Sequence, residues 1–236
     1  MSSSSPTCAR RLAAAFAARL IAVFAKLLTG VRGIWSGTTP KADQTLYFAN
    51  HTSHGDFVLL WTTLPPELRA LTRPVAGQDY WEISAMRRFI GRDVFNALMI
   101  RRSGIATSGS DASANPVDQM TEALRSGDSL IMFPEGTRNI GEDVLLPLKS
   151  GLYHLALACP QVRLVPVWIE NLDRVLPKGT LVPIPLACTV RYGKPIMRTD
   201  GEDKAAFMAR ARAAMLDLRP EYDRADDESA AIRDTP

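Results

Sequence analysis

From residue 44 onward, short apolar runs alternate with longer stretches in which apolar residues recur at helical spacing. Six runs have the length and the polar boundaries of β-strands: 45–49, 73–77, 96–100, 129–133, 163–169 and 187–193. Five stretches have helical periodicity: 54–63, 79–90, 117–126, 150–158 and 203–218. Because the two kinds of segment alternate, the pattern predicts an α/β fold with a mixed, mostly parallel sheet flanked by helices.

The N-terminal segment has a different pattern. Large apolar residues share one broad face of a predicted helix: Phe16, Leu20, Val23, Phe24 and Leu27. Arg19 and Lys26 limit the uncharged apolar runs to seven residues, whereas a membrane-spanning helix needs about 20. We therefore predict an amphipathic helix that lies in a membrane interface. A helix packed on the protein's own core and a cleaved signal peptide are the alternatives.

The distribution of charge also distinguishes the N-terminal segment from the rest of the chain. Residues 1–40 contain five basic and no acidic side chains, while the whole chain has a formal net charge of +3. We expect residues 1–40 to dock on an anionic membrane surface, residues 41–218 to form one domain, and residues 219–236 to be a charged, disordered tail. Lys and Arg do not cluster with aromatic residues elsewhere, so nucleic acid is not an expected partner. The three cysteines are far apart, which indicates a reducing compartment.

Residues 50–57, NHTSHGDF, connect a predicted strand to a predicted helix and allow three interpretations. The first is a helix capping box, because Ser53 is followed three residues later by Asp56. The second is a metal site that uses His51, His54 and Asp56. A catalytic zinc ion requires three well-placed ligands and supporting partners, and the chain has only one further histidine. We expect no metal site.

The third interpretation is a catalytic pair. In a continuous helix positions 51 and 56 lie about 140° apart, but a histidine on the turn before the helix can fold its ring back over the aspartate. The carboxylate of Asp56 would then fix the imidazole tautomer and stabilise the imidazolium. No Gly-x-Ser-x-Gly motif surrounds Ser53, so His51 would act as a general base on a hydroxyl group of the substrate.

A second motif, FPEGTRN at residues 133–139, lies at the carboxyl end of a predicted strand, where open α/β sheets bind ligands. Gly136 permits an unusual turn, Thr137 offers a hydroxyl group, and Arg138 offers a planar guanidinium suited to phosphate. An ordinary turn is the alternative interpretation. The residue types favour a site for an anionic group.

Together the two motifs resemble those of the glycerolipid acyltransferases, the family of the bacterial lysophosphatidate (1-acyl-glycerol-3-phosphate) acyltransferases. The resemblance extends over about residues 47–195, including the segments LMIRR, PLKSG and LVPVWI. Asn96 and Met99 stand where the family usually has glycine and phenylalanine, and Leu148 replaces the phenylalanine before the lysine. These departures concern the block that helps to select the acceptor.

The resemblance implies the glycerolipid acyltransferase fold and an O-acyltransferase activity for residues 41–218. His51, oriented by Asp56, would take the proton of an acceptor hydroxyl that attacks the thioester of acyl-CoA or acyl carrier protein. The implied acceptor is 1-acyl-glycerol-3-phosphate, which would give phosphatidate. The resemblance implies that the following residues bind the acceptor: Arg102, Glu135, Gly136, Thr137, Arg138 and Lys149. Since like charges repel, we expect Glu135 to hold Arg138 or a glycerol hydroxyl instead of the phosphate.

The resemblance requires no metal ion or other cofactor. It implies a peripheral or monotopic protein on the cytoplasmic face of the inner (plasma) membrane, with a lysophospholipid and the acyl donor as partners. We expect structural roles for His54 and His154. The alternatives are acylation of another lysolipid, such as a lyso-ornithine lipid, a non-catalytic lipid-binding scaffold, and a metal-dependent hydrolase.

Overall fold

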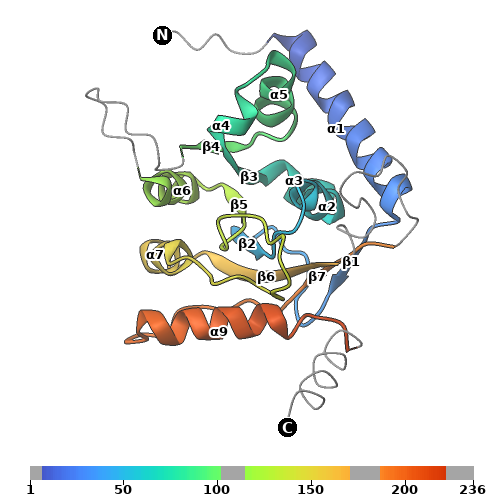
Figure 1. The fold of residues 1–236 in the computed structure, drawn as a ribbon. Coiled ribbons are helices and arrows are strands. Elements are labelled where there is room, and N and C mark those ends of the chain that lie inside the picture. The colour runs from blue at the N-terminus through green and yellow to red at the C-terminus, as the bar shows by residue number, and fades with distance from the viewer. Residues whose placement is uncertain (1–6, 102–114, 171–186, 222–236) are drawn as a thin grey trace.

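The computed structural model describes residues 7–101, 115–170 and 187–221. Within these residues the chain forms one seven-stranded sheet with the order β1-β7-β6-β2-β5-β3-β4 (Figure 1). The strands are β1 (Arg32–Trp35), β2 (Thr45–Ala49), β3 (Thr72–Gly77), β4 (Leu98–Ile100), β5 (Ser129–Met132), β6 (Arg163–Glu170) and β7 (Thr189–Tyr192). Neighbouring strands are parallel except β6 and β7, which are antiparallel. The predicted α/β fold with a mixed, mostly parallel sheet is confirmed.

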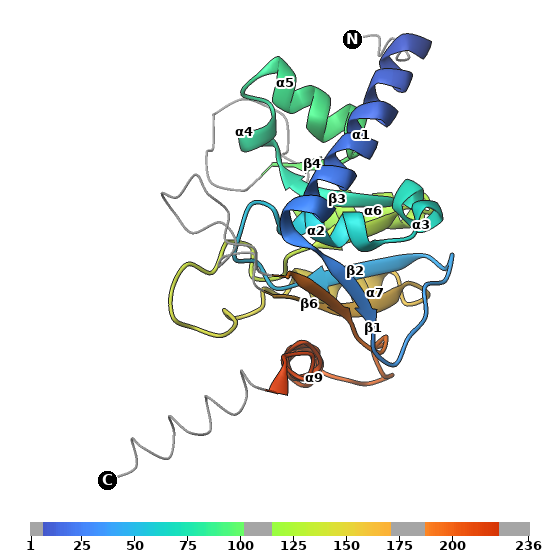
Figure 2. The ribbon, with the colours of Figure 1, turned by 90° about the vertical axis from the view of Figure 1, so that its right-hand side faces the viewer.

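Helices cover both faces of the sheet, as Figures 1 and 2 show. The described helices are α1 (Cys8–Thr29), α2 (Asp56–Thr63), α3 (Pro66–Leu71), α4 (Gln78–Trp81), α5 (Ala85–Arg88), the π-helix η1 (Phe89–Val94), α6 (Pro116–Arg125), α7 (Gly151–Ala158) and α9 (Lys204–Leu216). Helices α1 to α3 pack on one face, and α6, α7 and α9 pack on the other.

The central strand β2 divides the core between these two layers. Leu46 and Phe48 belong to the cluster under α6, α7 and α9, whereas Tyr47 and Ala49 belong to the cluster under α1 and α2. Successive side chains of a strand point to opposite faces, so a strand covered on both sides has an unbroken apolar sequence. The six predicted strands correspond to β2 to β7.

Three parts of the fold differ from the predicted pattern. The predicted helix at 79–90 consists of three short helices, and the Ser84 hydroxyl caps the second of them by accepting a hydrogen bond from the Arg87 N–H. Strand β1 was not predicted, because three of its four residues are exposed and give no apolar run. Helix α3 was not predicted, because Leu68 is its single buried residue.

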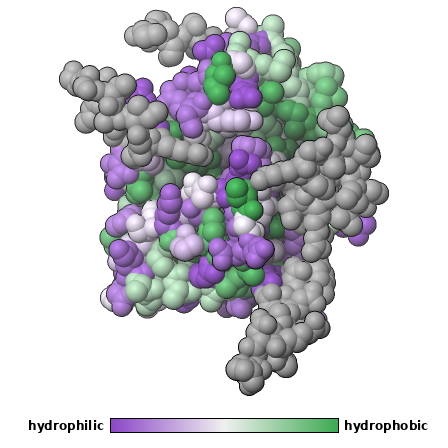
Figure 3. Space-filling model, in the orientation of Figure 1, coloured by the Kyte–Doolittle hydropathy of each residue, from purple (hydrophilic) through white to green (hydrophobic). Residues whose placement is uncertain are grey.

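Helix α1 packs on the domain mainly through small side chains, with the partly buried Ile21 as a larger one. Its buried residues are Ala14, Ala22, Ala25 and Thr29. The large apolar residues of the predicted face are exposed: Phe16, Leu20, Val23, Phe24 and Leu27. In the orientation of Figure 1, Figure 3 shows a hydrophobic surface over this helix, at the upper right. Despite Arg19 and Lys26, α1 is long and apolar enough to cross a membrane by length and composition, a test that core helices and signal sequences also pass.

The two sequence motifs leave the sheet at the same edge. Strands β2 and β5 are parallel neighbours with Phe48 paired to Met132. The segment after β2 begins at Asn50, and the segment after β5 begins at Phe133. The sheet register therefore brings NHTSHGDF and FPEGTRN together, although they are about 80 residues apart in the sequence.

Candidate active site

Asn50 fixes the start of the first motif to the neighbouring strand β6. Its amide Nδ2 donates to the carbonyl oxygen of Ile169 at 3.0 Å, and its Oδ1 accepts from the Ile169 N–H at 2.7 Å. Asn50 is buried, so both bonds are shielded from water. This two-bond connection holds the residue that precedes His51 against the sheet.

The His51 ring folds back over the start of α2, as the third interpretation of the motif required. Its Nδ1 lies 2.8 Å from Oδ2 of Asp56. The same oxygen accepts the main-chain N–H groups of Thr52 at 2.7 Å and Ser53 at 2.8 Å. The fully buried Asp56 carboxylate thus stabilises the turn before the helix and also binds the imidazole. The orienting interpretation fits this geometry. Of the capping box only the bond from the Ser53 N–H to Asp56 is present, because Gly55 is the residue that precedes the helix and no side chain caps it.

These contacts determine which ring nitrogen of His51 is available for chemistry. With Nδ1–H donating to the carboxylate, Nε2 carries the lone pair and can accept a proton. The His51 side chain is 17% exposed, so the ring is accessible from one side. Its other contacts include the ring of Phe133, which stacks at a centroid distance of 4.1 Å. The arrangement suits an oriented general base.

Glu135 is the buried acidic residue of the second motif. Its Oε1 accepts the main-chain N–H of His51 at 2.7 Å, and its Oε2 accepts the N–H of Leu146 at 2.9 Å. Burial raises the pKa of Glu135, while these two hydrogen bonds act in the opposite direction. Among the described residues, Glu135 forms no ion pair with Arg138. The carboxylate therefore bonds to the main chain and not to Arg138, which was one of the two partners that we expected, the other being a glycerol hydroxyl.

Gly136 and Lys149 lie against each other beside this carboxylate. Gly136 has φ +71°, and a Cβ atom at this position would lie 2.7 Å from both Cε and Nζ of Lys149. The Lys149 N–H also donates to the carbonyl oxygen of Pro134 at 2.8 Å. The backbone conformation therefore favours glycine, and the end of the lysine side chain occupies the place that a Cβ atom would take. The ammonium group of Lys149 is thereby placed beside the FPEGTR turn.

The remaining residues that were predicted to bind the acceptor are at least partly exposed to solvent. Gly136, Thr137 and Lys149 are exposed, and Arg138 is partly buried. Neither Arg138 nor Lys149 forms an ion pair with another described residue. Both cations are therefore available to an anionic ligand.

The predicted acceptor arginine Arg102 lies outside the described residues, so its role stays a prediction. Asn96, which stands where the resembled family usually has glycine, has φ 49°. Asparagine tolerates this left-handed conformation better than most residues, so the departure is conservative for the backbone.

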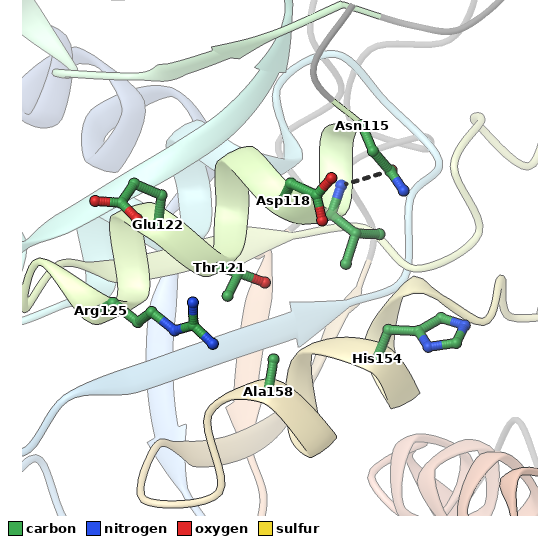
Figure 4. Close-up of a pocket in the computed structure, with 8 residues that line it drawn as sticks. Asn115, Asp118, Thr121, Glu122, Arg125, His154 and Ala158 are labelled. Carbon is green, nitrogen blue, oxygen red and sulfur yellow. Dashed lines mark hydrogen bonds between the residues drawn. The ribbon is translucent and has the colours of Figure 1, made fainter.

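The other two histidines lie in separate surroundings. The His54 ring stacks on Tyr80 at a centroid distance of 5.2 Å. His154 lines a pocket of about 530 Å³ between α6 and α7, together with Asp118, Glu122 and Arg125 (Figure 4). The residues that line this pocket include no member of the two motifs. In the part of the chain that the structure describes, no three His, Cys, Asp or Glu side chains are grouped to hold a metal ion.

Sequence reasoning missed several contacts of His51. It gave no role to the side chain of Asn50, to the Phe133 ring or to the main-chain N–H of Asn139, which donates to the His51 carbonyl oxygen at 2.6 Å. Asn50 and Phe133 belong to the two motifs, so their places in the sequence could have indicated a role in the site. The main-chain contact of Asn139 has no signature in residue type.

Comparisons with known proteins show which family the chain resembles. A family model described as Acyltransferase matches residues 36–170. The 1-acyl-sn-glycerol-3-phosphate acyltransferase of Limnanthes alba is 30% identical over 174 residues, which are 70% of this chain and 54% of that protein. The protein of the same name from Escherichia coli K12 is 28% identical over 167 residues, 65% of this chain and 60% of its own length. The chain thus spans about half the length of the curated relatives that it matches.

A solved structure supports the fold. The crystal structure of the 1-acyl-sn-glycerophosphate acyltransferase PlsC from Thermotoga maritima superposes with a TM-score of 0.62 and 19% sequence identity. The match covers 89% of this chain and 81% of that protein. At this level of identity the likeness concerns the arrangement of helices and strands.

Proposed function

This chain belongs to the acyltransferase family, and on that basis we propose that it transfers a fatty acyl group from acyl-CoA or acyl carrier protein to the free hydroxyl of a lysophospholipid. The proposed acceptor is 1-acyl-glycerol-3-phosphate, and the product is phosphatidate. Family membership confirms the resemblance seen in the sequence. The observation that carries the activity is the bond between His51 and the buried Asp56 beside the FPEGTR turn.

The proposed reaction uses the free nitrogen of His51. Nε2 accepts the proton of the acceptor hydroxyl while that oxygen attacks the thioester carbon. The tetrahedral intermediate then collapses, the carbon–sulfur bond breaks, and the departing thiolate takes the proton from the imidazolium. The negative Asp56 stabilises the imidazolium between the two proton transfers. A general base of this kind typically contributes about 10²- to 10⁴-fold to the rate, and the sequence of steps requires no metal ion or redox cofactor.

Cationic and polar groups of the second motif bind the acceptor phosphate in this proposal. Lys149 and Arg138 supply positive charge, Thr137 supplies a hydroxyl group, and Arg102 is the further cation implied by the family resemblance. Charge-assisted hydrogen bonds contribute roughly 1.5 to 3 kcal/mol each. The support is that Lys149 lies against Gly136 and that neither Lys149 nor Arg138 has an ion-pair partner among the described residues.

The proposed site of action is the cytoplasmic face of the inner (plasma) membrane. A lysophospholipid is presented at a lipid interface, so the enzyme must reach that interface. Helix α1 exposes its large apolar residues, and residues 1–40 have a net charge of +5. These properties suit a peripheral or monotopic contact with anionic lipid.

The test is product detection by mass spectrometry with the full chain. Acyl-CoA and acyl carrier protein donors are each combined with lysophosphatidate, other lysophospholipids and a lyso-ornithine lipid, for wild type and His51→Ala. Transfer to lysophosphatidate by wild type and its loss in the variant support the proposal. Transfer to a different lysolipid changes the acceptor, and a folded wild type that is inactive with every pair leaves a lipid-binding scaffold.

A further inference from the structure

Glu135 belongs to the motif assigned to the acceptor, but its side chain is almost inaccessible to any ligand. It is 2% exposed. Both carboxylate oxygens are engaged by main-chain donors, one by the N–H of His51 at 2.7 Å and the other by the N–H of Leu146 at 2.9 Å. Because so little of the side chain is exposed, a bound acceptor could reach these oxygens only if the residues that cover them moved.

The charge of Glu135 also opposes a role in phosphate binding. An ionised carboxylate repels a phosphate, and the repulsion is stronger in a buried site than in water. Burying a carboxylate is unfavourable unless hydrogen bonds compensate for the lost hydration. The two main-chain bonds supply part of that compensation and at the same time connect two separate segments of the chain.

The connection converges on the main chain of His51. Glu135 holds its N–H, and the N–H of Asn139 donates to its carbonyl oxygen at 2.6 Å. The Phe133 ring stacks on the imidazole. Residues 133–139 therefore contact the base on both sides of its main chain and on its ring, while Asp56 holds Nδ1. A shift of the FPEGTR turn would move His51 with it.

We propose that Glu135 is a positioning residue, which does not bind the acceptor but connects the acceptor-binding turn to the main chain of His51. Through Leu146 it also fixes the later part of the same loop. The position of Nε2 relative to an acceptor held by this turn then depends on Glu135. Misplacement of a reacting group by about 1 Å can lower a rate by about 10²-fold, so a change at Glu135 should lower kcat.

The kinetic test rests on the proposed function and compares Glu135→Gln with Arg138→Ala. Glutamine keeps the size of the side chain and one carbonyl oxygen, but its NH₂ group faces one of the two N–H donors. We expect kcat of Glu135→Gln to fall at least about tenfold while the acceptor KM stays within about threefold of wild type. Arg138→Ala should mainly raise the acceptor KM. For Glu135→Gln, a larger rise in KM, or a kcat within about twofold of wild type, overturns the proposal.

A second measurement is independent of activity and of the folding of a variant. Hydrogen exchange of the wild-type amides reports whether the His51 and Leu146 N–H groups are bonded. We expect both to be protected at least about 100-fold relative to an unstructured peptide, as the Lys149 amide, which donates to Pro134, should also be. Rapid exchange at His51 with a protected Lys149 amide overturns the bridge. If wild type acylates no lysolipid, this result still tests the bonds from the His51 and Leu146 N–H groups to Glu135 separately from the proposed function.

Discussion

One oxygen of the Asp56 carboxylate accepts the His51 ring N–H and the main-chain N–H groups of Thr52 and Ser53. Asp56→Asn separates the two roles of this group, because an amide oxygen can still accept N–H donors but cannot stabilise an imidazolium by charge. We expect kcat to fall by about 10²- to 10⁴-fold. The other oxygen, Oδ1, is buried without a hydrogen-bond partner among the described residues, so an NH₂ group there should cost about 1–3 kcal/mol of stability.

Steady-state kinetics and urea unfolding measure both effects. Ser53→Ala is the matched control, since it removes a hydroxyl that accepts the Gly55 N–H at 3.3 Å and leaves the His51–Asp56 bond in place. Its kcat should stay near that of wild type. Unchanged turnover in a folded Asp56→Asn variant would leave Asp56 with stabilisation of the turn before α2 as its only role.

Gly136→Ala tests whether Lys149 contacts the acceptor. The new methyl group would meet Cε and Nζ of Lys149 at 2.7 Å, and the flexible lysine would move away. We expect the acceptor KM to rise about tenfold, the equivalent of about 1.4 kcal/mol. The φ of +71° should add about 1–2 kcal/mol of destabilisation. Initial rates against acceptor concentration give KM, and thermal unfolding gives the stability.

Gly201→Ala is the control for backbone strain. Gly201 has φ +77°, and no atom lies within 4 Å of the position that its Cβ would take. The two alanine variants should lose similar stability, but only Gly136→Ala should change the acceptor KM. An equal KM in both variants would exclude Lys149 from acceptor binding.

The buried Glu135 predicts a pH dependence of stability. Burial raises its pKa in the folded protein, so the folded state binds this proton more tightly than the unfolded state. Protonation of Glu135 therefore stabilises the folded state. This contribution to the free energy of unfolding is fully present below the unfolded pKa of about 4.3 and is lost as the pH rises through the higher folded pKa. Glu135→Gln should remove this component. Urea unfolding of both proteins from about pH 4 to 7 should show wild type losing stability relative to the variant; a constant difference would contradict the shift.

At the scale of elements, what could be predicted depended on burial. Strand β2 is buried along its whole length and gives an unbroken apolar run, whereas β1 lies at the sheet edge and is mostly exposed. The edge position of the site was predictable too, because both motifs follow strands of a parallel sheet. The bond from the His51 N–H to Glu135 was not, since a main-chain donor 84 residues away has no signature in residue type.

In helix α1 the apolar pattern of the sequence did not identify the residues that contact the domain. Its apolar periodicity was predicted from its large side chains, yet mostly small ones make the contact with the domain. Ala25→Leu should therefore overpack this contact and cost about 1–3 kcal/mol. Ala15→Leu adds the same atoms at an exposed position of the helix and should change stability by less than about 0.5 kcal/mol. Thermal unfolding of the two variants compares them, and equal stability would show that the alanine face is not closely packed.

At the scale of the whole molecule, the exposed side of α1 should determine membrane attachment. Removing the N-terminal segment to test this would also remove β1, which pairs with β7, so substitutions are the cleaner test. Leu20 and Phe24 are 52% and 66% exposed, and they are not among the residues that pack α1 on the domain. Leu20→Ser combined with Phe24→Ser should leave the fold intact while it weakens binding to bilayers.

The measurement is flotation with vesicles that contain anionic phospholipid. Each exposed large apolar side chain contributes up to about 1.5–3 kcal/mol when it is fully buried in lipid, so the double variant should bind at least about 10-fold more weakly. Leu157→Ser combined with Met197→Ser removes comparably exposed apolar surface outside α1 and should bind like wild type. Because residues 1–40 carry a net charge of +5, wild-type binding should also weaken as salt rises. If both double variants float equally well, the protein reaches its acceptor through another surface, and α1 serves the fold alone.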